Sequence, residues 1–403
     1  MIASERTARA DRPTIRLLAG HSKRLRGGHP WVFSNEIAMD EAARAIAPGT
    51  VARMVDAGGE ALACATFNPH SLITARVLDD DPEAAFDAPE ITARISAALA
   101  LRERLYDSPF YRLVHAEADR LPGLVVDRHG DVVVVQANTA GMECCLPEVL
   151  AALAQVLGPV GVVLRCDASV RKLEGLESYV RQKGAVPSGP IEVIEGGVRF
   201  RADPTGGQKT GWYYDQRDNR GFVAGLARGL DVLDVYSHAG GFGLRALAGG
   251  AERAVLIDSS DAALELARIA AEANGFAGRA SFVHAEAFRE LERRGVAGER
   301  WGLVVADPPS FVKSRKDLGS GARGYRKLAR LAAALVAPGG FLAIASCSYH
   351  VDTALFAEQV RRGLGDAERS GRILRSAGAA PDHPVHPALP ESAYLKCLVL
   401  QLD

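Results

Sequence analysis

The sequence predicts a multidomain protein with a small β barrel at its N-terminus, a central α+β domain and a C-terminal, doubly wound α/β domain. Three observations lead to this fold class. The chain has 403 residues, which is too long for one ordinary domain. Its first 80 residues read as short strands joined by turns, and from residue 230 onward strands and helices alternate strictly. We place the domains at residues 13–80, 88–200 and 201–403.

The N-terminal domain is predicted from four strand-like segments bounded by turn residues. Gly58 and Gly59 separate the second and third segments and supply the positive φ that a tight hairpin needs. A polar stretch with Asp and Pro, residues 79–90, then links this domain to the next. The four predicted strands are residues 14–18, 51–56, 61–67 and 72–78.

The central domain mixes both kinds of secondary structure. Apolar residues near helical spacing predict helices over residues 89–105 and 146–157. Gly196 and Gly197 predict the turn of a hairpin over residues 191–200. Apolar runs predict strands at residues 124–127, 132–136 and 162–166.

The C-terminal domain has the Rossmann-like pattern of a doubly wound parallel sheet, with seven apolar runs separated by segments of helical length. Its second helix shows signals at both ends. Ser260 and Asp261 predict the start, and Asn274 and Gly275 predict the end. The seven predicted strands are residues 232–235, 254–258, 280–284, 303–306, 341–345, 372–374 and 395–400.

Composition and charge restrict the class of protein. The chain carries 48 Lys and Arg against 49 Asp and Glu, so its net charge of -1 neither requires nor excludes an anionic partner. No apolar segment reaches membrane-spanning length and the N-terminus does not resemble a signal peptide, so we expect a cytoplasmic protein. The six cysteines show no metal-ligand spacing, so we predict neither a metal site nor disulfides.

A glycine-rich turn follows the first strand of the C-terminal domain, from Asp234 to Gly243. Such a turn lets a ligand approach the backbone at a helix N-terminus. The second strand ends at Asp258, about where a carboxylate binds ribose hydroxyls in nucleoside-binding sheets. Together these features predict an adenosine-containing cofactor. Tyr236 and His238 stand where a full dinucleotide pattern would have glycines, which argues against a nicotinamide cofactor.

Two other strands of this domain end at reactive side chains. One apolar run stops at Asp307, which two following prolines hold at the sheet edge, and another stops at Cys347. If these strands are parallel neighbours, the carboxyl and the thiol emerge about 5 Å apart, one strand spacing. An acid and a nucleophile would then face one flat substrate. We expect the other five cysteines to pack in cores, the commonest place for a free thiol.

Basic residues gather in three places and indicate contact with nucleic acid. One run precedes residue 27, one lies among aromatic residues in the segment 206–220, and one spans residues 313–330. Glycines in the last segment predict a mobile loop. A solvated surface and packing of a linker are the alternatives. The residues that we expect to bind RNA are Lys23, Arg24, Arg26, Lys209, Arg217, Lys313, Arg315 and Arg323.

In these motifs the chain resembles a family of S-adenosylmethionine-dependent enzymes, the bacterial 23S ribosomal RNA cytosine-5 methyltransferases of the RlmI type. Residues 29–33 and 68–71 resemble its PUA domain, an RNA-binding β barrel, and residues 112–127 resemble its central domain. Glu286 differs mildly from the Asp that is more usual in the family. The motifs of the methyltransferase domain are residues 208–211, 234–243, 258, 307–311 and 346–348.

The resemblance implies S-adenosylmethionine as the cofactor, 23S ribosomal RNA as the partner and 5-methylcytosine as the product. It also implies that the Cys347 thiolate adds to carbon 6 of cytosine and that Asp307 hydrogen-bonds the base near N3. The base that removes the carbon 5 proton is unassigned, and the oligomeric state is open between a monomer and a homodimer. The residues expected at the cofactor are Gln208, Tyr213, Asp234, Ser237, Gly240, Gly241, Asp258, Glu286 and Asp307.

Three other functions stay open. A methyltransferase acting on the amino group of guanine would use the Asp-Pro-Pro loop without a thiol. A nicotinamide oxidoreductase would share the turn and Asp258, with a fuller glycine pattern. A non-catalytic RNA-binding protein would keep the β domain and the basic runs and would bind no cofactor.

Overall fold

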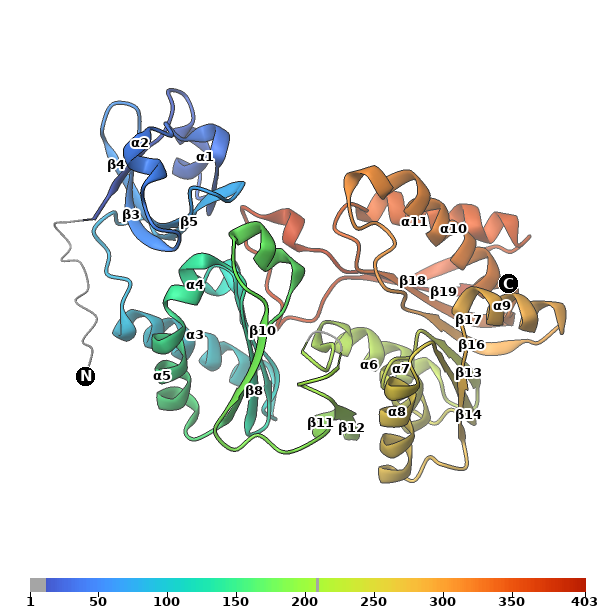
Figure 1. Cartoon of the computed structure of the whole chain (residues 1–403). Helices are drawn as coiled ribbons and strands as arrows, with labels where there is room; N and C mark the ends of the chain where they lie inside the picture. The colour runs from blue at the N-terminus through green and yellow to red at the C-terminus, as the bar shows by residue number, and fades with distance from the viewer. Residues whose placement is uncertain (1–11, 208–209) are drawn as a thin grey trace. The chain divides into compact units, whose positions relative to one another are not determined.

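The computed structural model describes residues 12–207 and 210–403, and its internal contacts divide the chain into two compact units (Figure 1). The first unit comprises Met1–Ser188 with Pro384–Pro390, and the second comprises Gly189–His383 with Glu391–Asp403. The hairpin of β11 (Ile191–Glu195) and β12 (Val198–Ala202) therefore belongs to the second unit, whereas the sequence pattern grouped it with the central domain.

The first unit begins with a five-stranded sheet. Its strands are β1 (Thr14–Arg16), β2 (Trp31–Phe33), β3 (Thr50–Val55), β4 (Ala61–Phe67) and β5 (Ile73–Asp79), with the short helices α1 (Ser22–Arg26) and α2 (Glu41–Arg44). The strand order is β1-β3-β4-β5-β2. Gly59 has a φ of +91° in the turn between the antiparallel β3 and β4, which confirms the predicted hairpin. Ile15, Met54 and Phe67 are fully buried in the core of this sheet.

The same unit contains a second five-stranded sheet. Its elements are α3 (Ala88–Leu105), β6 (Phe110–His115), β7 (Leu124–His129), β8 (Val132–Ala137), α4 (Ala140–Cys144), α5 (Leu146–Leu157), β9 (Gly161–Cys166) and β10 (Tyr179–Lys183). The order is β10-β9-β8-β7-β6, and α3 packs against α5. The predicted helices and strands are confirmed. The strands β6 and β10 were not predicted, and for β10 the reason is that this edge strand is mostly exposed and lacks an apolar run.

The second unit is built on a seven-stranded sheet. Its strands are β13 (Asp231–Val235), β14 (Arg253–Asp258), β15 (Ala280–His284), β16 (Trp301–Ala306), β17 (Val336–Ser346), β18 (Gly371–Ala377) and β19 (Lys396–Leu402). Its helices are α6 (Arg217–Leu226), α7 (Gly241–Ala248), α8 (Asp261–Ala273), α9 (Ala287–Val296), α10 (Leu318–Ala334) and α11 (Thr353–Asp366). These elements confirm the predicted seven-stranded α/β domain.

The strand order in this sheet is β15-β14-β13-β16-β17-β19-β18. The chain moves to one side from β13 and to the other side from β16, so these two parallel neighbours form a topological switch point. Ligands of open α/β sheets bind outside the carboxyl ends of the strands at such a point. The predicted doubly wound parallel sheet is confirmed except at β19, which runs antiparallel to both neighbours. An apolar run reports burial and carries no information on strand direction.

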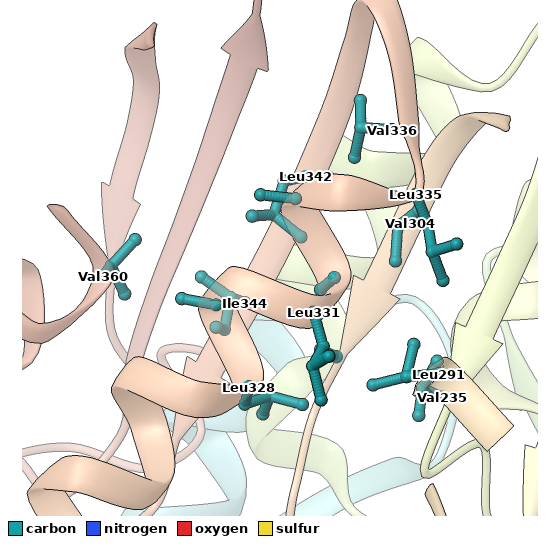
Figure 2. Packing of buried hydrophobic residues seen from close by; sticks show 14 of the residues in the cluster. Val235, Leu291, Val304, Leu328, Leu331, Leu335, Val336, Leu342, Ile344 and Val360 are labelled. Atoms are coloured by element: carbon teal, nitrogen blue, oxygen red, sulfur yellow. The ribbon is translucent and has the colours of Figure 1, made fainter. Parts of the chain in front are cut away.

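A single apolar core holds β17 in place within this unit (Figure 2). Leu342 and Ile344 of β17 meet Leu328 and Leu331 of α10, and Val360 of α11 joins the same cluster. Full burial of each of these side chains contributes about 1.5–3 kcal/mol. The core therefore fixes the position at which β17 ends and the residues after it begin.

Candidate active site

The loop between β13 and α7 has an unusual backbone. Tyr236 and His238, the two residues that stand where glycines were expected, have φ values of +64° and +48°, in the left-handed region. Such conformations cost about 1–3 kcal/mol each and are found at ligand clamps. The backbone N–H of His238 donates to Oδ2 of Asp258 at 2.8 Å, which helps to hold the loop. Gly240 has a φ of +83°, and a Cβ there would lie 3.0 Å from the side chain of Leu256.

Two buried oxygen atoms near this loop have no hydrogen-bond partner among the described residues, Oδ1 of Asp234 and Oγ of Ser237. The other carboxyl oxygen of Asp234 accepts a hydrogen bond from the backbone N–H of Gly243 at 2.7 Å. Burial raises the pKa of Asp234 to about 7. An unsatisfied buried polar atom costs about 1–3 kcal/mol. The two oxygens therefore fit a bound molecule that carries polar hydrogens, as an adenosine-containing cofactor does.

Carboxylates also stand at the ends of β14 and β15. Half-buried Asp258 accepts hydrogen bonds from the backbone N–H groups of His238 and Ser260, at 2.8 and 2.9 Å. Exposed Glu286 caps α9 by accepting from two backbone N–H groups of its first turn, at 3.1 and 2.9 Å. The backbone thus orients both side chains. A contact of Glu286 with adenine stays a prediction beside its capping role.

Tyr213 lies beside the same loop, with its ring centroid 5.2 Å from that of His238. Its backbone carbonyl accepts a hydrogen bond from Arg220 at 2.6 Å. Arg220 in turn donates two hydrogen bonds of 2.7 Å to Glu195 of the β11–β12 hairpin, and both side chains are almost fully buried. A buried ion pair therefore anchors the backbone that carries Tyr213. The predicted residues that lie outside the described part of the chain are Gln208 and Lys209.

Asp307 and Cys347 leave the sheet at the same edge. They follow β16 and β17, which are neighbouring parallel strands, as the sequence predicted. The Cys347 sulfur lies 4.0 Å from the carbonyl oxygen of Pro308, the residue after Asp307. Burial raises the pKa of Tyr213, and negative charges that include Asp307 and Cys347 raise it further. The phenol, the carboxyl and the thiol therefore share one electrostatic environment.

Ser348, directly after Cys347, joins three elements around this edge. Its fully buried hydroxyl lies 2.8 Å from the hydroxyl of Ser310 and 2.7 Å from that of Tyr325 on α10. It also accepts from the backbone N–H of Val312 at 3.3 Å. In the sequence, Ser348 is identified only as part of the motif 346–348 around Cys347. No local pattern could have revealed its role, because all three partners come from other elements.

The basic residues expected at RNA differ in their surroundings. Arg24 pairs with Glu36 at 3.1 Å, and Arg26 pairs with Asp56 at 3.0 Å. Arg217 faces the protein, with 13% of its side chain exposed. These three cations are therefore engaged within the chain, and their contact with RNA stays a prediction. Arg24 and Arg26 are nevertheless exposed, and the other exposed cations among the described members of the predicted set are Lys23, Lys313, Arg315 and Arg323.

The basic, glycine-containing segment is helical from Arg315 onward, and the expectation of a mobile loop there is wrong. It forms a short 3₁₀ turn at Arg315–Asp317 and then α10. A Cβ at Gly321 would lie 2.4 Å from a methyl carbon of Val312 and 2.6 Å from the carbonyl oxygen of Phe311. The glycine therefore allows the helix to pack closely against the loop after β16.

Comparisons with known proteins agree with this geometry. The profile of a family described as S-adenosylmethionine-dependent methyltransferase matches residues 147–398, and that of a PUA-like domain matches residues 15–80. Ribosomal RNA large subunit methyltransferase I of Vibrio cholerae is 38% identical over 398 residues, which cover 96% of this chain and 100% of that protein. The chain belongs to this methyltransferase family. The protein of the same name from Photobacterium profundum is 38% identical over 388 residues, 95% of this chain and 98% of that protein.

Solved structures share the fold of this chain over 96–97% of its length. A putative methyltransferase from Streptococcus mutans has a TM-score of 0.80 at 18% identity and covers 96% of this chain and 100% of that chain. A putative methyltransferase complexed with SAH has a TM-score of 0.81 at 18% identity and covers 97% and 99%. At 18% identity, this similarity shows a shared fold and nothing about function.

The family membership makes S-adenosylmethionine the cofactor of this methyltransferase. The unsatisfied oxygens of Asp234 and Ser237 fit that molecule, which carries an ammonium group and ribose hydroxyls. Within the described ranges, no group of His, Cys, Asp or Glu side chains could hold a metal ion. No helix among the described residues is both long enough and apolar enough to cross a bilayer.

Proposed function

We propose that this methyltransferase makes 5-methylcytosine in the 23S RNA of the large ribosomal subunit, through a covalent bond between Cys347 and the target base. The name of the relatives supports ribosomal RNA as the substrate. The observation that carries the cytosine-5 chemistry is the half-buried thiol of Cys347, whose sulfur lies 4.0 Å from the carbonyl oxygen of Pro308, next to Asp307.

The cofactor would lie across the ends of β13 and β14, where the strained loop leaves room for close approach. Asp234 and Ser237 would bind its polar groups, and Asp258 would accept from the ribose hydroxyls. When bound, S-adenosylmethionine supplies an electrophilic methyl group. The remaining residues that we propose at its rim are Gln208, Tyr213, Gly240, Gly241, Glu286 and Asp307.

Cys347 would activate carbon 5 of cytosine for methylation. Carbon 5 of cytosine is a poor nucleophile while the ring is aromatic. Addition of the thiolate to carbon 6 gives an enamine whose carbon 5 can take the methyl group. A base then removes the carbon 5 proton, the carbon–sulfur bond breaks, and the aromatic ring is restored. Asp307 would hydrogen-bond the base near N3 and stabilise the charge that develops during addition.

RNA contact would involve both units. A base inside a helix cannot reach the thiol, so the target nucleotide must leave its stack. We call residues 307–312, which follow β16, the catalytic loop. Exposed Lys313, Arg315 and Arg323 come after it in the chain and would bind the phosphates of the RNA around the target base. In the first unit Lys23 on α1 would serve the same purpose. We assign RNA binding to residues 13–80, an accessory role to residues 88–200 and catalysis to residues 201–403.

Replacement of Cys347 by Ala tests this function. We expect Cys347→Ala to abolish methyl transfer to ribosomal RNA, measured by nucleoside mass spectrometry, with cofactor affinity by calorimetry unchanged. Cys144→Ala is the matched control, since this exposed thiol lies on α4 in the first unit and should not affect activity. Full activity of Cys347→Ala would exclude the covalent mechanism. A methylguanine product would instead support the guanine amino-group alternative.

A trapping experiment tests the covalent bond itself. RNA that contains 5-fluorocytosine cannot lose the substituent on carbon 5 as a proton, so the adduct should persist. We expect the native enzyme with cofactor to form a complex with this RNA that survives denaturing electrophoresis. The Cys347→Ala variant should form none, and a complex that persists in this variant would assign the nucleophile to another residue.

A further inference from the structure

A buried lysine stands beside the candidate nucleophile. Lys396 is the first residue of β19 and pairs in register with Ser346 of β17, next to Cys347. Only 4% of its surface is exposed. Lysine is almost never buried unless its charge is compensated, because removing an ammonium group from water is costly. The position of Lys396 therefore needs a physical reason.

Hydrogen bonds offset only part of the cost of burying the Lys396 ammonium. The Lys396 ammonium donates to the backbone carbonyls of Ser348 and Tyr394, both at 2.6 Å. These acceptors are neutral, and they tie the residue after Cys347 to the segment before β19. Burial lowers the pKa of Lys396 to about 8, while negative charge on Cys347, and less strongly on Asp352, raises it. The strongest opposite charge available to the ammonium is therefore a Cys347 thiolate.

We propose that Lys396 is a positioning residue that keeps the Cys347 thiol ionised and holds the turn that carries it. This role rests on the proposed function in one respect, since it assumes that the thiol is the nucleophile. A positive charge within about 4–6 Å of an ionisable group favours its anionic form. A thiol with an ordinary pKa of about 8.5 is mostly protonated at neutral pH, so an adjacent ammonium raises the reactive fraction.

The described titratable groups that share an electrostatic environment with the thiol include two phenols and two carboxylates, and none of these four carries positive charge. Two phenols share its environment, and both have a pKa that burial raises, so they stay neutral near pH 7. Two carboxylates bring negative charge, which opposes thiol ionisation. The phenols are those of Tyr213 and Tyr325, and the carboxylates are those of Asp307 and Asp352.

The pH dependence of Cys347 alkylation tests the proposal without RNA or cofactor. Iodoacetamide reacts with the thiolate, and the tryptic peptide 331–361 contains Cys347 as its only cysteine, so mass spectrometry can follow this site alone. We expect the native protein to show an alkylation midpoint below about 8.5, the value of an ordinary thiol. A native midpoint at or above this value would overturn the proposal without any variant.

Three substitutions separate charge from anchoring. Lys396→Gln keeps a donor for the carbonyls and removes the charge, so the midpoint should rise by about 1 pH unit or more, with alkylation at pH 7 about tenfold slower. Lys396→Met should do the same, and Lys396→Arg should keep the low midpoint. An unchanged midpoint in folded Lys396→Gln would mean that the lysine only anchors the turn, and the proposal would be wrong. If the Gln and Met variants do not fold, the alkylation midpoint of Cys347 in the native protein still decides between the proposal and an ordinary thiol.

The result is independent of the proposed reaction. If the midpoint rises in Lys396→Gln while Cys347→Ala still methylates RNA, the effect of Lys396 on Cys347 ionisation is supported and the covalent mechanism is wrong. If the midpoint does not move while Cys347→Ala is inactive, the covalent mechanism stands and the role of Lys396 fails.

Discussion

Replacement of Asp234 by Asn tests whether the cofactor loop holds a carboxyl group that prefers its protonated form. The side chain is 1% exposed and accepts one hydrogen bond, from the backbone N–H of Gly243. Its Oδ1 has no partner among the described residues. Asparagine keeps the size of the side chain and the acceptor for Gly243, but it cannot ionise. The comparison of Asp with Asn therefore isolates the charge.

Burial raises the folded-state pKa of Asp234 from 3.8 to about 7, and this gives the sign of the effect. Below pH 3.8 the carboxyl is protonated in both states and its contribution to stability is complete. As the pH rises toward 7, the unfolded chain releases the proton while the folded chain keeps it, so the free energy of unfolding falls. The total loss is about 4 kcal/mol, and about 3 kcal/mol of it falls between pH 5 and pH 8. Above about pH 8 no further loss is expected, because the carboxyl is then ionised in both states.

Urea unfolding at pH 5, 6, 7 and 8 measures this difference. Trp212 and Trp301 are buried in the second unit, so a Trp31→Phe background makes tryptophan fluorescence report on that unit alone. Relative to Asp234, the Asp234→Asn variant should gain about 3 kcal/mol of unfolding free energy between pH 5 and pH 8. The missing hydrogen bonds of the amide add an offset that does not change with pH. A constant difference across this range would refute the reasoning.

Further predictions concern packing around the site. Arg220→Met should cost about 3–5 kcal/mol by urea unfolding because it leaves Glu195 buried without its partner, and the double variant Arg220→Met/Glu195→Gln should recover most of that loss. Gly240→Ala should lower the thermal midpoint more than Gly298→Ala, since both have positive φ but only Gly240 would place a Cβ 3.0 Å from neighbouring side chains. Equal effects would mean that backbone strain alone matters. Ser348→Ala should lower kcat for RNA methylation about tenfold with cofactor affinity unchanged, because the loop after β16 loses its hydrogen bonds to the residue that follows Cys347. A weakened cofactor affinity in that variant would contradict this interpretation.

Several parts of the site could be predicted because their signals are local. Ser260 caps α8 by accepting from the backbone N–H of Ala263 at 3.2 Å, as its position before an amphipathic run indicated. Asp307 and Cys347 each follow an apolar run, and the carboxyl ends of parallel strands meet at one edge of a sheet. Tyr236 and His238 interrupt a glycine pattern, and the structure shows that they adopt the backbone that glycine favours.

Other parts could not be predicted, because they depend on which surfaces meet in the fold. The glycines of α10 resembled those of a flexible loop, yet Gly321 serves close packing against Phe311 and Val312. Arg24 and Arg217 are expected at RNA from the sequence alone, and the fold places Glu36 and Glu195 beside them, so their contact with RNA stays a prediction. A sequence shows that a charge is present and does not show which opposite charge will reach it.

The amino-acid sequence by itself indicated most of the strands and helices, the glycine turns between them, and the reactive side chains that stand at strand ends. These features depend on residues that are close together in the chain. Only the tertiary structure decided that β19 runs antiparallel beside β17, and this pairing brings the Lys396 ammonium to the backbone carbonyl of Ser348, next to Cys347. It also decided that the Ser348 hydroxyl joins the catalytic loop to α10. Such contacts join residues far apart in sequence, and the packing of the apolar core determines which of them form.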